Sequence, residues 1–121
     1  MPPNTEIDAW KAQLRKGAAE LAVLALLAKG ETYGIQLLDQ INGAAGLELS
    51  EGSIYPLLNR LQKDGKIKGE WVEDPDSSHP RKYYALTKDG RALLKDMVAA
   101  WHDFDRGMHS ILRQEVVRAR A

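Results

Sequence analysis

Cysteine is absent from this sequence, and so is any long run of uncharged apolar residues. Without cysteine there are no disulfides, no thiolate metal clusters and no cysteine nucleophile, which excludes several enzyme classes. The richest apolar stretch, residues 18–28, contains Glu20 and is shorter than the roughly eighteen residues that a membrane span needs. The first residues lack the basic start and apolar block of a signal peptide. We therefore expect a soluble, cytoplasmic protein with no membrane partner.

An excess of charge of one sign is also missing. The 121 residues include 17 Lys plus Arg and 17 Asp plus Glu, so the formal net charge is zero. Bulk composition therefore gives no electrostatic reason for binding nucleic acid, and such an argument must rest on where the charges lie. The length and the apolar fraction of 44% fit a single compact domain.

Helical periodicity marks two segments in the first third of the chain. Apolar residues at helical spacing run from Ile7 to Lys29 and predict one helix, or two consecutive helices with a bend near Gly17. Thr32 is expected to cap a further helix that ends at Asn42, before a glycine-rich break.

A third helix is predicted to begin after Ser50. This serine stands between Leu49 and Ile54, which are spaced like a hydrophobic staple. Pro56 follows inside the helix, where it removes one backbone hydrogen bond and clashes with the carbonyl of Gly52 unless the first turn is irregular, so the start of this helix is left open. The apolar positions of this helix share one face and are expected to point inward; they are Ile54, Leu57, Leu58 and Leu61.

A β-hairpin is predicted after the third helix. Residues 66–73 carry Ile67 and Trp71 on one side of a strand, residues 74–80 form a turn, and residues 81–86 are rich in β-formers. Three helices followed by two strands is the order of a winged helix-turn-helix. The predicted fold class is thus mainly α with a two-stranded β wing.

The last predicted helix begins after Thr87 and runs to about Arg113. Its apolar residues alternate in steps of three and four, as in a heptad seam, and are Leu94, Met97, Trp101, Phe104, Met108 and Ile111. Such a helix is roughly 40 Å long, whereas a compact domain of this size has a radius of gyration of about 13 Å. We therefore expect residues 1–86 to form the DNA-binding domain and residues 87–121 to form a helix that pairs with a second copy of the chain.

The outward face of the third helix is the candidate reader of a DNA major groove. If the apolar face points inward, the opposite face and its flanks carry Gly52, Ser53, Tyr55, Pro56, Asn59, Arg60 and Lys63. From Asn59 to Lys68 there are four basic residues and one acidic residue, a local charge of +3 in a neutral chain. Arg81 and Lys82 follow the hairpin turn, where they can grip phosphates. The competing interpretation is an ordinary solvated helix face.

Five separate segments carry a more specific signal. They are Leu14-Arg15-Lys16-Gly17-Ala18, Glu31-Thr32-Tyr33-Gly34-Ile35, Leu49-Ser50-Glu51-Gly52-Ser53-Ile54-Tyr55-Pro56-Leu57-Leu58, Arg60-Leu61-Gln62-Lys63-Asp64-Gly65 and Pro80-Arg81-Lys82-Tyr83-Tyr84-Ala85-Leu86-Thr87. In this order they resemble the PadR family of bacterial transcriptional regulators, over roughly residues 14–92.

This resemblance implies a winged-helix repressor that dimerises through its C-terminal helix and binds a pseudo-palindromic operator of double-stranded DNA. Carried over residue by residue, the family positions near DNA are Tyr33, Gln36, Ser53, Tyr55, Pro56, Asn59, Arg81 and Lys82. The basic cluster adds Arg60 and Lys63 as candidate DNA-binding residues.

The single C-terminal helix resembles that of the small regulators of this family, some of which respond to drugs. Their paired tryptophans sandwich flat aromatic ligands, and Trp101 occupies the matching position. Its neighbours Met97, Phe104 and Asp105, together with Trp10, are the further candidates for a planar aromatic effector. An aromatic and methionine seam also suits a dimer core, and the two roles can coexist.

The sequence gives little support for a metal site or a catalytic site. His102, Asp105 and His109 share a helix side but lack a fourth metal ligand nearby, so no metal or other cofactor is predicted. Nothing assembles a nucleophile, a base and an oxyanion hole, so no enzyme is predicted. Two alternatives stay open: a dimeric winged-helix module that binds proteins and no DNA, and a DNA-binding regulator without a small-molecule site.

Overall fold

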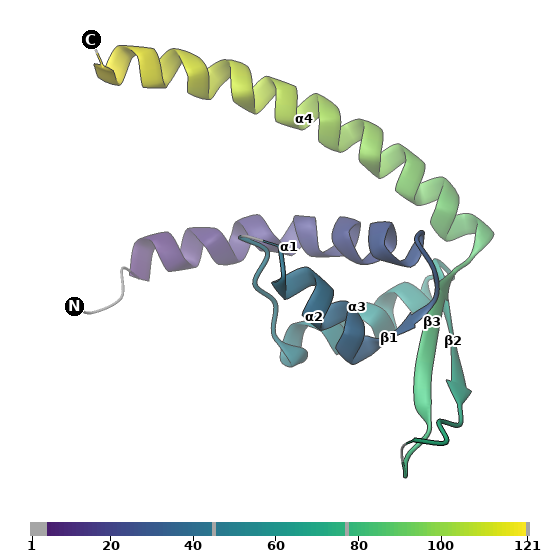
Figure 1. The fold of residues 1–121 in the computed structure, drawn as a ribbon. Helices are drawn as coiled ribbons and strands as arrows, with labels where there is room; N and C mark the ends of the chain where they lie inside the picture. The colour runs from purple at the N-terminus through teal and green to yellow at the C-terminus, as the bar shows by residue number, and fades with distance from the viewer. Residues whose placement is uncertain (1–4, 45, 77, 121) are drawn as a thin grey trace.

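The computed structural model describes residues 5–44, 46–76 and 78–120, with side chains described as far as residue 113. The first three helices are α1 (Thr5–Leu27), α2 (Gly34–Asn42) and α3 (Glu51–Lys63). Of the two predicted alternatives for this segment, the single helix is confirmed, since α1 continues without interruption through Gly17 (Figure 1). In the described residues no helix is long and apolar enough to cross a bilayer.

The wing contains one strand more than the sequence predicted. It is an antiparallel sheet of β1 (Thr32–Tyr33), β2 (Ile67–Val72) and β3 (Arg81–Leu86), in the order β1-β3-β2. The predicted two-stranded wing was therefore wrong in strand number, because Thr32 pairs with Tyr84 and Tyr33 pairs with Tyr83.

The extra strand changes the start of α2. Tyr33 occupies the N-cap position in extended conformation, and Thr32 lies in β1, so the prediction that Thr32 caps the helix was wrong. The Thr32 hydroxyl instead donates a hydrogen bond to the side-chain oxygen of Gln36. On α2 Ile35 is exposed, whereas Leu37, Leu38 and Ile41 are buried.

One apolar core joins α1, α2, α3 and the sheet. Its residues are Val23, Leu24, Leu27, Leu37, Leu38, Ile41, Ile54, Leu58, Leu61, Ile67, Tyr84 and Leu86. The loop between α2 and α3 is closed by Asn42, whose side chain accepts from the Leu49 amide at 2.7 Å and donates to the Leu49 carbonyl at 3.0 Å. These bonds fix the position of Leu49, close to the start of α3. The face of α3 that packs on the core is buried, and the opposite face is exposed.

The last helix, α4 (Lys88–Arg120), is longer than predicted. Thr87 caps it as expected: the Gly90 amide donates to Thr87 Oγ1 at 3.0 Å, and that hydroxyl donates to the Gly65 carbonyl at 2.6 Å. The cap thus ties α4 to the turn between α3 and β2. From this joint α4 leaves the core and diverges from α1 (Figure 1).

Candidate nucleic-acid interface

The outward face of α3 has the composition that the sequence predicted. Ile54, Leu58 and Leu61 are buried, and Leu57 is half-buried. The predicted outward side chains are all exposed: Ser53, Tyr55, Pro56, Asn59, Arg60 and Lys63. Pro56 stands inside the helix, which continues through it from the N-cap at Ser50. The helix therefore offers a ridge of hydroxyl, amide and basic groups to a partner.

Tyr55 links this ridge to the start of α2. A Cβ atom on Gly34 would lie 2.8 Å from Cε1 of Tyr55, so the ring rests on the bare backbone of that glycine. Tyr55 also lies close to Tyr84, whose phenol has a pKa above its usual value because burial disfavours the anion and the Tyr55 charge adds repulsion. The Tyr55 ring is thus packed in place, although its side chain remains partly exposed.

Tyr33 and Gln36, the predicted DNA contacts at the start of α2, also contact residues of the sheet. The Tyr33 ring meets Tyr83 edge-on with centroids 5.5 Å apart, and the Arg81 guanidinium lies 4.4 Å from the Tyr33 centroid. Arg81 also forms an ion pair with Asp74 at 3.3 Å. The Gln36 side chain is exposed and accepts the Thr32 hydrogen bond. The wing and α2 therefore form a continuous surface.

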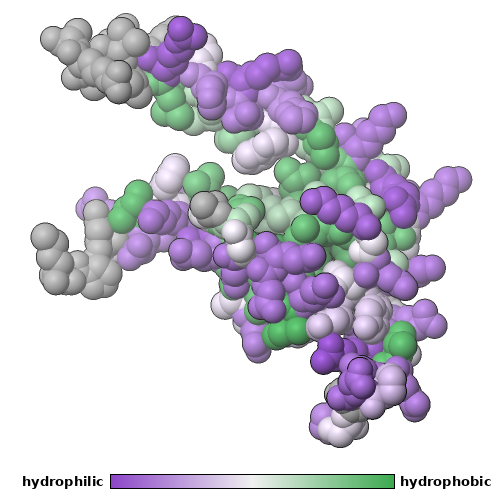
Figure 2. Space-filling view, viewed as in Figure 1, coloured by the Kyte–Doolittle hydropathy of each residue, from purple (hydrophilic) through white to green (hydrophobic). Residues whose placement is uncertain are grey.

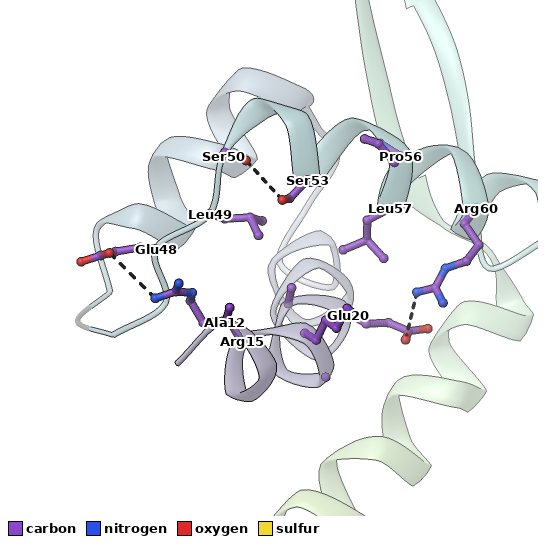
Figure 3. A pocket seen from close by; sticks show the side chains of 13 residues that line it. Ala12, Arg15, Glu20, Glu48, Leu49, Ser50, Ser53, Pro56, Leu57 and Arg60 are labelled. Carbon is purple, nitrogen blue, oxygen red and sulfur yellow. Dashed lines mark hydrogen bonds and ion pairs between the residues drawn. The ribbon is translucent and has the colours of Figure 1, made fainter. Parts of the chain in front are cut away.

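A groove of about 940 Å³ runs beside α3, between this helix, α1 and the loop that precedes α3. Arg60 pairs with Glu20 of α1 at 3.2 Å at one end, and Arg15 pairs with Glu48 at 3.9 Å at the other (Figure 3). Ser53, which lines the groove, accepts a hydrogen bond from the Ser50 hydroxyl at 3.2 Å. Part of the basic charge near the predicted reading face is thus balanced by a carboxylate from another helix.

The predicted seam of α4 divides into two parts. Leu94 and Met97 are half-buried against the core of their own chain. The later members are exposed; they are Trp101, Phe104, Met108 and Ile111. The rings of Trp101 and Phe104 lie 5.8 Å apart.

Exposed apolar side chains also occur on the first half of α1. Ile7, Trp10 and Leu14 are 40%, 57% and 47% exposed. Figure 2 shows open space between this part of α1 and the outer part of α4, with apolar residues bordering it. The predicted ligand residues are thereby split between two diverging helices, since Trp10 comes from α1 and the others from α4.

Asp105, a candidate ligand contact, lies 3.7 Å from His109 Nδ1. Among the described residues no three histidine or carboxylate side chains are grouped closely enough to hold a metal ion. His102, Asp105 and His109 are all exposed on α4.

Comparison with known proteins decides the class of this fold. The model of the transcriptional regulator PadR-like family matches residues 23–96. The chain belongs to the PadR-like family. It is therefore a DNA-binding transcriptional regulator and not an enzyme, which goes against the alternative of a protein-binding module without DNA.

Named relatives agree with this assignment. A transcriptional regulator of Mycobacterium tuberculosis is 30% identical over 84 residues, which cover 69% of this chain and 76% of that protein. The crystal structure of a PadR family regulator from Eggerthella lenta is 29% identical, with a TM-score of 0.78, covering 90% of this chain and 94% of the other. A PadR-like regulator from Bacillus cereus is 33% identical, with a TM-score of 0.75, covering 83% and 96%.

Three residues that contact the predicted DNA-binding side chains were not predicted from the sequence. Glu20 lies on α1 and pairs with Arg60, and no spacing within either helix reveals that contact. Trp71 and Gly69 face Lys82 from the neighbouring strand. A glycine inside a strand of β-formers is a signal that could have been used, because it often marks a close approach of another group.

Proposed function

We propose that this PadR-like regulator is a cytoplasmic, ligand-responsive repressor that binds a pseudo-palindromic operator as a homodimer. In each subunit α3 enters a major groove and the β2–β3 wing contacts the adjacent backbone. The observation that carries the proposal is the exposed ridge of α3, flanked by the basic residues of the wing. With two subunits related by a twofold axis, the half-sites are about one helical turn, or a small multiple of it, apart.

The roles on this surface follow from the chemistry of each side chain. Tyr55 and Asn59 can donate to and accept from base edges, so they are proposed as readers of sequence, with Ser53 and Pro56 beside them. The basic side chains are proposed to bind phosphates, which fixes position without reading sequence; they are Arg60, Lys63, Arg81 and Lys82. Tyr33 and Gln36 extend the contact at the start of α2.

Dimerisation is supported by the unpartnered apolar faces of two helices. Trp101, Phe104 and Ile111 are 41%, 56% and 63% exposed on α4, and Trp10 is 57% exposed on α1. A group of exposed large apolar side chains on a single subunit indicates a surface that binds another molecule. In the proposed dimer the outer part of α4, within residues 87–121, lies against α1 and α4 of a second copy.

The effector is proposed to be a planar aromatic molecule that stacks on Trp101 between the subunits. The support is the pair of adjacent rings, Trp101 and Phe104, on the surface of α4. In the proposed dimer these two rings lie near the same two rings of the second subunit. Such a ligand releases DNA only to the extent that it binds the two arrangements of the dimer with different affinity. Quenching of tryptophan fluorescence by planar aromatics, lost in Trp101→Ala, tests this site.

The salt dependence of DNA binding tests the phosphate contacts. If four basic residues of each subunit each bind one phosphate, the slope of log K against log salt is about −7. Fluorescence anisotropy with a labelled duplex over a range of KCl concentrations gives this slope. A slope near zero contradicts the phosphate contacts. A chain that is a monomer in analytical ultracentrifugation contradicts the proposed homodimer.

The sequence readers are tested with DNA from the region upstream of the protein's own gene. Asn59→Ala is expected to weaken binding to this DNA more than to a random duplex, because base contacts carry the discrimination. Lys82→Ala is expected to weaken both alike, because phosphates are the same in every sequence. Equal losses with Asn59→Ala would contradict its role as a reader.

A further inference from the structure

Two aromatic rings hold the ammonium group of Lys82. Its Nζ lies 5.8 Å from the centroid of the Trp71 ring and 5.6 Å from that of Tyr84. Trp71 is the direct partner of Lys82 across the strand pair, and Tyr84 follows two residues later on the same face. A cation within about 6 Å of a ring face is attracted to it. The position of this charge is thus set from two sides.

Gly69 provides the space for this arrangement. A Cβ atom at Gly69 would lie 2.5 Å from Lys82 Cε, 3.4 Å from its Nζ and 3.2 Å from Oε1 of Gln62. The lysine side chain therefore lies across bare backbone, with the last turn of α3 beside it through Gln62. A side chain at position 69 would occupy the same volume.

The two predicted cations of the wing lie on opposite faces of the sheet. The face of Lys82 also carries Ile67 and Leu86, which belong to the core shared with α3, so Lys82 faces the corner between wing and α3. Arg81 faces the other side and pairs with Asp74. Among the described residues no carboxylate lies within ion-pair distance of Lys82, so its charge is not neutralised.

Trp71 has no role in the core that would explain it. Its side chain is 66% exposed, the highest value among the large apolar residues described. We propose that Trp71, with Gly69 beside it, is a positioning residue for DNA binding, which holds the Lys82 ammonium at the corner where a DNA phosphate passes between the wing and α3. This inference rests on the proposed phosphate contact of Lys82.

The physical benefit is a lysine that is ordered before DNA arrives. A free lysine side chain loses much rotamer freedom when it is fixed on a phosphate. The rings of Trp71 and Tyr84 already restrict that freedom, while a cation–π contact leaves the ammonium able to donate to a phosphate oxygen. Tyr84 is buried in the core, so Trp71 and Gly69 are the positions at which the arrangement can be changed without loss of the fold.

The test is a set of variants of the full chain, measured by anisotropy with a labelled random-sequence duplex. Trp71→Leu and Gly69→Ala are each expected to weaken binding about two- to fivefold for each wing that contacts the duplex, the size of a cation–π contact. Trp71→Phe keeps a ring face and is expected to restore most of the affinity. Val72→Ala, an exposed residue on the opposite face of β2, is the control and is expected to bind like the parent chain.

The Lys82→Met background separates positioning from structure. In this background Trp71→Leu and Gly69→Ala are expected to have no further effect, since the charge that they position is gone. If they weaken binding equally in both backgrounds, the positioning role is refuted while the phosphate contact of Lys82 stands. If Lys82→Met itself binds like the parent, both the contact and its positioning are refuted. Thermal unfolding of each variant confirms that the chain is folded.

Discussion

At the scale of single residues, Gly90 fixes the joint between the DNA-binding part and α4. A Cβ atom there would lie 1.9 Å from the Lys66 carbonyl oxygen, a backbone atom that cannot rotate away. Gly90→Ala is therefore expected to destabilise the chain by about 2–3 kcal/mol, although alanine is the better helix former. Urea unfolding followed by circular dichroism measures this.

Gly52→Ala is the matched control, since the nearest atom to its Cβ is Ser50 Oγ at 3.7 Å, an ordinary contact. It is expected to leave stability unchanged or to raise it by up to about 1 kcal/mol. A Gly90→Ala chain as stable as the Gly52→Ala chain would mean that α4 can shift at its start without cost.

Tyr84 is a residue whose titration is tied to the fold. Burial, and secondarily the charge of Tyr55, raises its pKa in the folded chain above the ordinary value of about 10. The unfolded chain therefore releases the Tyr84 proton at lower pH, so stability is lost as the pH rises from the unfolded pKa towards the folded one. Urea midpoints above pH ~10 are expected to fall less steeply in Tyr84→Phe than in the parent chain. Tyr83→Phe, a half-exposed neighbour, is expected to follow the parent.

At the scale of elements, the contact between α1 and α3 limits the charge available to DNA. Arg60 pairs with Glu20, whose side chain is 30% exposed against 56% for Arg60. Glu20→Gln is expected to raise affinity for a random duplex about two- to threefold, because Arg60 is released and one repulsive charge near DNA is removed. Asp96→Asn on α4 is the control, since it makes the same change in net charge at an exposed position of another helix.

The increase from Glu20→Gln should shrink to that of Asp96→Asn when Arg60 is replaced by alanine. An increase that survives the loss of Arg60 would assign the effect to Glu20 alone. Anisotropy titrations at matched salt compare the parent chain, the three single variants and the double variant Glu20→Gln/Arg60→Ala.

The same elements show which features a single sequence can reveal. The inward and outward faces of α3 follow from its own 3.6-residue period, so Ile54 and Asn59 were placed correctly. The strand β1 has two residues, too few for any periodicity, and exists because Thr32 pairs with Tyr84 far along the chain. Threonine is common both at helix N-caps and in strands, so Thr32 alone could not distinguish the two. A helix cap was therefore predicted from the sequence where the structure has a strand.

The candidate site divides in the same way. On α3 the residues proposed to touch DNA lie on the outward face, which periodicity could identify, and the family resemblance could identify those of the wing. Their supporting partners come from other elements: Glu20 beside Arg60, Asp74 beside Arg81, and Trp71 beside Lys82. Such contacts depend on how helices and strands pack in three dimensions, which spacing along one element does not encode.

At the scale of the whole molecule, the proposed homodimer can be tested at the apolar face of α4. Phe104 is 56% exposed and lies outside the core, so its replacement should leave the winged helix folded. In a homodimer, Phe104→Glu removes two buried rings and buries two carboxylates, and each lost ring is worth about 2–3 kcal/mol. Sedimentation velocity is therefore expected to show the variant as a monomer at micromolar concentrations where the parent is a dimer.

Ser110→Glu adds the same charge on the opposite side of α4 and is expected to sediment as the parent does. DNA affinity of Phe104→Glu should fall with the dimer, because one subunit neutralises half as many phosphates and the salt slope is halved. A Phe104→Glu chain that remains a dimer would move the interface away from α4. A monomer that keeps the full salt slope would show that the two wings do not act on one duplex.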